Sequence, residues 1–323
     1  MRPVRLLFVA ATAALACVCG RAAAAVVGPY TPDGATLHLY HLDDAGAPAA
    51  DAAGTLPMQG LLNDAALGAT ALPGFGTALD TSAAGSAVGS RPILLAAPAL
   101  VNGAGDDVPF SHANPATGAF TIEALVKFGY DPSAAPARGS ANSLQVVSMD
   151  GDASERVFQL RIDPIGFNSG TSDNTRNRVE FINIRQGTGV QSYVVNLPDA
   201  GDPNAADAGS WFHLAVAYDG NENTPNNLSV YWTKVDPSAT AANLLGQTTL
   251  ANDLSAVAGD FAIGNEARNT GGASESFIGQ IDEVRISSVA RTADQFVFAV
   301  PEPSGLALLA PLGVLLARRR RPE

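Results

Sequence analysis

The sequence predicts an all-β protein, a two-sheet antiparallel β-sandwich of the jelly-roll type, and three observations support this. Apolar and polar residues alternate in many short segments, Gly, Pro, Asn and Asp cluster between these segments, and no long stretch shows the apolar period of a helix. Period-two alternation is typical of half-buried strands. Many short strands separated by turn residues are typical of sandwiches and jelly rolls.

The clearest strand is the segment FTIEALVKF at residues 120–128. Its apolar face consists of Phe120, Ile122, Ala124, Val126 and Phe128, and its polar face of Thr121, Glu123 and Lys127. The other predicted strands are 144–149, 157–162, 179–184, 192–197, 212–218, 228–232, 261–264 and 278–286. Residues 43–105 are rich in Ala and Gly. We expect short strands and loops at the edge of the same domain there, because a second core would need more bulky side chains.

The closing segment, 278–286, breaks the simple alternation. Ile281, Val284 and Ile286 cannot share one face at strict period two. Either both faces are buried, or a bulge at Asp282 and Glu283 shifts the register. Asp282 is the side chain that such a bulge would most directly re-aim.

The N-terminus predicts a signal peptide over residues 1–25. Arg2 and Arg5 precede an apolar run at 6–18, and small residues follow at 22–25. Lipid attachment at Cys17 or Cys19 is the alternative, but neither follows a convincing lipobox. Both cysteines lie within this signal, so the mature domain, 26–299, must be held without disulfides by its own core. Its length of about 275 residues is enough to bury such a core.

The predicted mature domain is acidic. Outside residues 26–299 lie seven arginines and two glutamates, so the domain keeps 12 basic and 29 acidic residues and a net charge of about −17. A field of that sign repels nucleic acid and anionic lipid and attracts divalent cations. We therefore expect no nucleic-acid partner.

The C-terminus, residues 300–323, resembles a PEP-CTERM sorting tail. Pro301, Glu302 and Pro303 precede an apolar run at 305–317, and Arg318, Arg319, Arg320 and Arg321 follow. The resemblance implies transient membrane insertion and cleavage by an exosortase-type membrane protease. The alternative is a permanent anchor, but 13 apolar residues span only ~20 Å of a ~30 Å hydrocarbon core. We expect an exported protein at the envelope surface or in the extracellular matrix of a Gram-negative-type bacterium.

Five segments, taken in order, resemble a laminin-G-like domain of the concanavalin A-like lectin and glucanase superfamily. They are LYHLDD at 39–44, GFGTAL at 74–79, FTIEALVKF at 120–128, WFHLAVAYDG at 211–220 and FIGQIDEVRI at 277–286. The resemblance covers residues 36–298 and departs from the family at Leu125, where Trp is usual. It implies a structural calcium beside the opening strand, held by Asp282, with Asp43 and Asp44 as weaker candidates near that strand. Alternatively, Asp282 only accepts hydrogen bonds from backbone amides at a strand end.

Other candidate site residues favour packing over chemistry. His213 has no second His or Cys at ligand spacing, so we expect a hydrogen-bonded packing residue. His38 and His41 fall on opposite faces of a strand and cannot chelate one ion together. Trp211 and Trp232 lie in apolar strands, where core positions are favoured over sugar-stacking platforms.

The sequence predicts no catalytic residue. A retaining glycosidase needs two carboxyl groups ~5 Å apart, and Glu123 and Glu180 each stand alone in a predicted strand. We expect a non-catalytic module that recognises carbohydrate, exopolysaccharide or a matrix partner. The alternatives are a structural envelope or matrix protein without a specific ligand, or a glycoside hydrolase or polysaccharide lyase of the same superfamily.

Overall fold

The computed structural model describes residues 28–62, 65–82, 93–96, 113–132, 143–150, 156–163, 177–185, 189–236, 239–255, 257, 259, 261–266, 275–296 and 298. The strands are β1 Thr36–Tyr40, β2 Gly60–Leu62, β3 Ala66–Thr70, β4 Thr77–Asp80, β5 Ile93–Leu95, β6 Phe120–Phe128, β7 Leu144–Asp150, β8 Arg156–Asp163, β9 Arg178–Arg185, β10 Gly189–Asn196, β11 Trp211–Tyr218, β12 Leu228–Lys234, β13 Leu244–Thr248, β14 Phe261–Ile263 and β15 Gly279–Ser287. A short 3-10 helix, η4, spans Ala293–Gln295.

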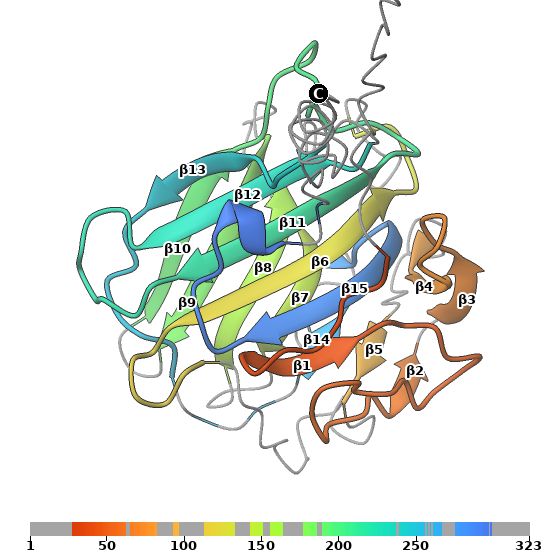
Figure 1. Cartoon of the computed structure of the whole chain (residues 1–323), viewed down its shortest axis with the longest axis horizontal. Coiled ribbons are helices and arrows are strands. Elements are labelled where there is room, and N and C mark those ends of the chain that lie inside the picture. The colour runs from red at the N-terminus through yellow and green to blue at the C-terminus, as the bar shows by residue number, and fades with distance from the viewer. Residues whose placement is uncertain are drawn as a thin grey trace, which may run out of the picture. The chain divides into compact units, whose positions relative to one another are not determined.

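These strands form the predicted two-sheet antiparallel β-sandwich. The eight-stranded sheet has the order β13-β12-β11-β6-β15-β4-β3, with β1 paired to β15. The seven-stranded sheet has the order β10-β9-β8-β7-β14-β5-β2. Figure 1 shows the eight-stranded sheet in front of the strands β7 to β10 of the other sheet. Within the described residues, no helix is long and apolar enough to span a membrane.

Alternation along the strands builds the core between the sheets. On β6 the even-numbered residues from Phe120 to Phe128 lie in the core, as predicted. On β11 the core residues are again the even-numbered ones, and Phe212 stacks on Trp232 of β12 with ring centroids 4.6 Å apart. Trp232 is fully buried and Trp211 is 6% exposed, so both tryptophans are packing residues, as expected.

Both alternatives for the closing strand are found in the structure: all but one residue of β15 are buried, so both faces are covered, and a bulge shifts the register. The pairing of β15 with β6 shifts register between Asp282 and Arg285, and Glu283 has a φ of 49°. That left-handed backbone conformation is uncommon for a residue other than glycine. The shift lets Ile281, Val284 and Ile286 all reach the core.

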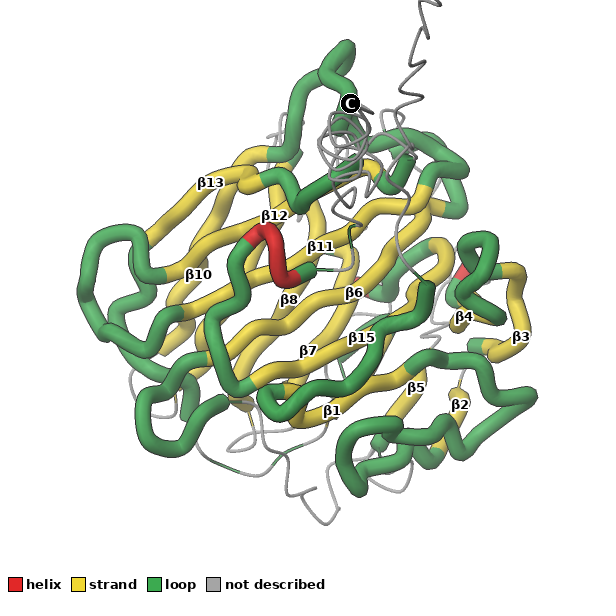
Figure 2. The backbone as a smooth tube through the Cα atoms, viewed as in Figure 1, coloured by secondary structure: helices red, strands yellow, loops and turns green. Residues whose placement is uncertain are grey.

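The Ala- and Gly-rich region lies at the edges of both sheets, as expected. β3 and β4 end the eight-stranded sheet, and β2 and β5 end the seven-stranded sheet. The tube in Figure 2 shows these short strands joined by long loops. All described residues belong to one compact unit, Ala24–Val300.

Candidate functional site

The outer face of the eight-stranded sheet carries a buried ionic network. Glu123 of β6 accepts hydrogen bonds from Nε of Arg285 at 2.7 Å, and its other oxygen lies 3.1 Å from Nε2 of His213. Burial raises the pKa of Glu123, but Arg285 and His213 outweigh it and lower the pKa from 4.5 to about 2. His213 is fully buried, which confirms the prediction of a hydrogen-bonded packing histidine.

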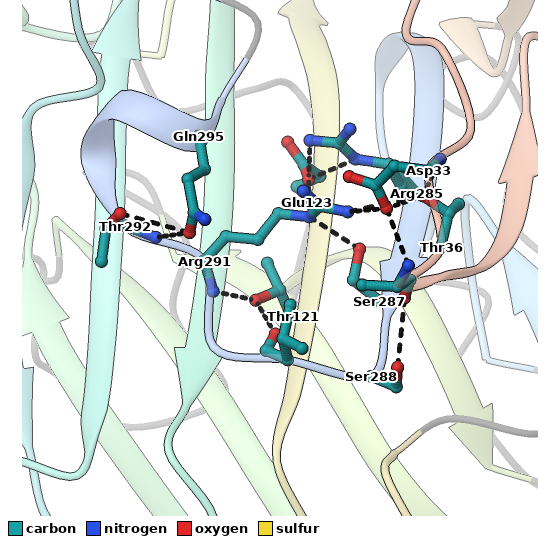
Figure 3. A network of polar contacts seen from close by, with 12 residues as sticks. Asp33, Thr36, Thr121, Glu123, Arg285, Ser287, Ser288, Arg291, Thr292 and Gln295 are labelled. Atoms are coloured by element: carbon teal, nitrogen blue, oxygen red, sulfur yellow. Dashed lines mark hydrogen bonds and ion pairs between the residues drawn. The ribbon is translucent and has the colours of Figure 1, made fainter.

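The segment that follows β15 extends this network through hydrogen bonds of Arg291. The Arg291 guanidinium donates to Ser287 Oγ at 2.8 Å and to Asp33 Oδ1 at 2.8 Å, while the Arg291 backbone amide donates to Thr121 Oγ1 at 2.8 Å. Figure 3 shows Arg291 lying between Thr121 and Asp33, beside the pair of Arg285 and Glu123. The network therefore joins the N-terminal segment, β6, β15 and the segment after β15.

Aromatic side chains close the same face. Phe296 and Phe298 pack their rings on His213, with centroids 4.8 and 5.4 Å away, and Phe296 also packs on Tyr231 at 4.9 Å. Figure 2 shows η4, which precedes Phe296, lying over β11 and β12. The small residues Ala215 and Ala217 belong to the same apolar cluster. This part of the sheet is covered by the chain itself, so it offers no open surface to a ligand.

The outer face of the seven-stranded sheet is polar instead. We call it the polar face; its members are Gln145, Asp150, Arg156, Gln159, Arg161, Asp163, Arg178, Glu180, Glu266 and Glu275. Its origin is visible in β8, where Phe158, Leu160 and Ile162 alternate into the core and the intervening polar residues point away. The register then determines which charges meet across the strands.

Ion pairs cross from β8 to β9. Arg161 lies opposite Glu180 and donates to it at 2.7 Å, and Arg178 lies opposite Asp163 and donates at 2.9 Å. Arg178 also lies 3.8 Å from Glu180, which links the two pairs. Ser192 of β10 donates a hydrogen bond to the second oxygen of Glu180. The row therefore extends over three neighbouring strands.

A second group lies where β7 and β8 meet the end of β14. Arg156 holds Asp150 with two hydrogen bonds, one of them at 3.0 Å from Nη2 to Oδ2. The amide nitrogen of Gln159 donates both to Asp150 and, at 2.7 Å, to Glu266. Two carboxylates, one from β7 and one from the segment after β14, thus converge on one amide. Sequence reasoning missed this pair because it considered carboxylates strand by strand.

On the polar face, the acidic side chains are much more deeply buried than the arginines that pair with them. The side chains of Asp150, Asp163 and Glu180 are 0%, 2% and 4% exposed. Their partners Arg156, Arg178 and Arg161 are 23%, 21% and 18% exposed. Planar guanidinium groups backed by carboxylates suit the recognition of polar, oxygen-rich ligands.

The predicted calcium ligand Asp282 lies at the bulge of β15 and is fully buried. Its Oδ1 accepts a hydrogen bond from the Glu283 amide at 2.8 Å, and its Oδ2 has no hydrogen-bond partner among the described residues. Burial, the charge of Glu283 and that of Asp43 raise the pKa of Asp282 from 3.8 to about 9. Asp43 therefore lies close enough for its charge to act on Asp282.

Asp43 is held in place by the glycine-rich segment. Its Oδ1 accepts a hydrogen bond from the Thr77 amide at 2.6 Å. A Cβ on Gly76 would lie 2.0 Å from that same oxygen, and Gly76 has a φ of 75°, so only glycine fits. One signal of this arrangement was already present in the sequence, in the glycines of 74–79.

The other acids nearby have different roles. Glu283 accepts from the Tyr30 amide and contacts Nδ1 of His41, each at 2.7 Å, and Asp44 accepts from the Ala50 amide at 2.9 Å in an exposed loop. No group of three or more His, Cys, Asp or Glu side chains in the described residues is arranged to hold a metal. The residues of the predicted signal peptide and sorting tail, Pro301 to Arg321 included, lie outside the described residues.

Two antiparallel sheets packed face to face, with one outer face covered and the other polar, define a lectin-like β-sandwich. The profile of the Concanavalin A-like lectin/glucanases superfamily (Laminin_G_3) matches residues 102–296. The chain belongs to this superfamily. Among curated protein sequences, none matches it significantly.

Solved structures with a similar fold come from several organisms. A putative carbohydrate binding protein from Bacteroides ovatus ATCC 8483 is 22% identical, with a TM-score of 0.34, and the match covers 59% of this chain and 42% of that one. The Trypanosoma rangeli sialidase in complex with sialic acid is 12% identical, with a TM-score of 0.40 and coverage of 82% and 32%. The sialyllactose-bound CBM40 of the Ruminococcus gnavus IT-sialidase is 13% identical, with a TM-score of 0.34 and coverage of 60% and 95%. The chain spans less than half the length of the first two.

Proposed function

We propose that the protein is an exported, non-catalytic binding module that recognises carbohydrate through the polar face. The observation that carries this proposal is the row of Arg161, Glu180, Arg178 and Asp163 across β8 and β9. The register fixes Arg161 and Arg178 against buried carboxylates, so their guanidinium groups present donors without further ordering, which reduces the entropic cost of binding. The opposite sheet is covered by the segment with Phe296 and Phe298, so the polar face is the favoured surface.

The convergence of Asp150 and Glu266 raises the second candidate function, glycoside hydrolysis. Retaining glycosidases hold two carboxyl groups ~5 Å apart around the scissile bond. Here the amide nitrogen of Gln159 occupies the point between the two carboxylates and donates to both. Asp150 is also paired with Arg156, and both acids are at most 1% exposed. This arrangement supports a binding role, in which the acids orient Gln159 and Arg156.

We expect the full chain, purified in mild detergent, to be retained saturably on one or more polysaccharides in affinity electrophoresis. The panel should contain neutral and acidic polymers and bacterial exopolysaccharide, with bovine serum albumin as the unretained control. Release of reducing or unsaturated sugar ends would instead support a hydrolase or lyase. Absence of both retention and turnover would favour a structural matrix protein.

Export and sorting form the second part of the proposal. It rests on the order of the three tail parts, Pro301 to Pro303, the apolar run and Arg318 to Arg321. The tail would insert transiently in the membrane and be cleaved by an exosortase-type protease, leaving the domain at the envelope surface or in the matrix.

We expect deletion of residues 301–323 to leave the domain folded but misplaced. The core between the two sheets is built from residues between Tyr40 and Ile286, so circular dichroism and the melting temperature should be unchanged. Fractionation of the producing bacterium should show loss of the surface-bound pool. A pool that stays unchanged after the deletion would contradict the sorting role.

Calcium binding at Asp282 and Asp43 is a third part of the proposal. It is supported by the buried Oδ2 of Asp282, which has no hydrogen-bond partner among the described residues, and by the charge of the exposed Asp43, which acts on Asp282. Ca²⁺ prefers six to eight oxygen ligands, from carboxylates and carbonyls among others. The ion would neutralise the paired acids and link the loop after β1 to the bulge of β15.

A further inference from the structure

The three arginines of the polar face share one arrangement. Each is anchored to a carboxylate that is almost completely buried, and each keeps about a fifth of its own side chain exposed. The surface that a ligand meets is therefore made of guanidinium edges, while the compensating negative charge lies beneath. The arginine edges are the exposed part of these three pairs, although the polar face as a whole holds three arginines and five carboxylates on a domain whose overall charge is strongly negative.

The guanidinium groups also have donors to spare. Arg156 uses Nε and Nη2 on Asp150, Arg161 uses Nε and Nη1 on Glu180 and Gln159, and Arg178 uses Nε on Asp163 and approaches Glu180 through Nη2. In contacts between described residues, Nη1 of Arg156, Nη2 of Arg161 and Nη1 of Arg178 have no partner. Each guanidinium thus keeps an amino group for an external acceptor.

We propose that the polar face selects an acidic polysaccharide, whose sugar carboxylates are bound by Arg156, Arg161 and Arg178. This inference rests on the proposed carbohydrate-binding function and names its ligand class. A guanidinium binds a planar carboxylate through charge-assisted hydrogen bonds that a hydroxyl group cannot match. Arg161 and Arg178 lie on neighbouring strands, which are about 4.8 Å apart, so the face can contact more than one acidic group of a polymer.

The negative charge of the domain helps to distinguish specific binding of an acidic polymer from non-specific adsorption. An acidic domain repels a polyanion at long range. Retention on an acidic polymer therefore requires direct contacts with exposed cationic groups, whereas a basic protein would be retained anywhere on its surface.

The probe is polygalacturonate, compared with its highly methyl-esterified form, which has the same backbone but few charges. We expect the full chain to bind polygalacturonate about tenfold or more tightly than the ester. One charge-assisted hydrogen bond is enough to explain a difference of this size. The test variant is the double substitution Arg161→Gln with Glu180→Gln, which removes an ion pair without leaving a buried charge. It should lose about tenfold in affinity for polygalacturonate and little for the ester.

The matched control is Lys234→Gln with Asp207→Asn. This pair removes one charge of each sign from a surface ion pair at the end of β12, in the other sheet, and should leave binding unchanged. Thermal unfolding by circular dichroism verifies that each variant is folded. If the first double variant does not fold, Arg178→Gln with Asp163→Asn replaces it.

The outcomes separate the two proposals. Equal binding of the acid and the ester, or unchanged affinity in the folded test variant, overturns the acidic-ligand inference and leaves carbohydrate binding intact. Retention on neutral polymers alone has the same meaning. No retention on any polymer overturns both proposals. Selective binding of the acid, lost in the test variant and kept in the control, supports the inference.

Discussion

Replacing Glu123 with alanine is expected to destabilise the domain by about 3–5 kcal/mol, the cost of breaking a buried ion pair by removing one partner. Arg285 is 5% exposed and His213 is fully buried, so neither can recover its interaction from water. Since domains of this kind are stable by only ~5–15 kcal/mol, the variant should be close to unfolding at 37 °C. Urea denaturation followed by circular dichroism measures the loss.

The matched control is Asp33→Ala, which removes the partner of Arg291 in the same network. Asp33 is 50% exposed, and exposed ion pairs are worth about 0–1 kcal/mol. A loss for Glu123→Ala no larger than that for Asp33→Ala would show that the buried network does not hold this face together.

The acid dependence of stability gives a second readout of the same network. The pKa of Glu123 falls from 4.5 to about 2 on folding. A lowered folded pKa means that the stabilisation is complete above about pH 4.5 and is lost as the pH falls toward 2. We expect the melting temperature of Glu123→Gln to fall less than that of the wild type between pH 4.5 and pH 2. An equal fall in both proteins would contradict the lowered pKa of Glu123.

Most of the fold could be predicted from the sequence, because burial on one face imposes period-two alternation. The segment at 120–128 predicted β6 and its core face. The broken alternation at Ile281, Val284 and Ile286 predicted either burial of both faces or a bulge, and β15 has both. β13, at Leu244–Thr248, was not predicted. It is a short edge strand whose residues are all exposed or half-buried, so it has no continuous apolar face.

The site was less accessible to sequence reasoning, for a physical reason. The alternation of Gln159, Arg161 and Asp163 along β8 shows that one face is polar. It does not show that Arg161 meets Glu180, because that pairing depends on the register between β8 and β9. The convergence of Asp150 and Glu266 on Gln159 depends on three strands at once. Asp282 and Asp43, by contrast, were proposed through motif resemblance. The pairing of β1 with β15 brings together the strand that precedes Asp43 and the part of β15 that follows Asp282.

Chelation is expected to lower the melting temperature of the wild-type domain by roughly 5–10 °C. A ligand at 100 times its dissociation constant stabilises by about 2.7 kcal/mol, and each kcal/mol shifts the melting temperature by ~2–4 °C in a domain of this size. The measurement compares melting in millimolar calcium with melting in EDTA, by circular dichroism.

Asp282→Asn is the decisive variant, because it keeps the shape of the side chain and removes the charge that a cation would require. We expect it to melt at the same temperature with calcium and with EDTA. In EDTA it should be at least as stable as the wild type, since burial and the charges of Glu283 and Asp43 disfavour the carboxylate. Asp44→Asn is the control and should keep the full calcium response, because Asp44 serves an exposed loop. If EDTA does not change the melting temperature of the wild type, the calcium proposal is wrong. Asp282 would then be a buried acid that accepts a hydrogen bond from the Glu283 amide at the bulge.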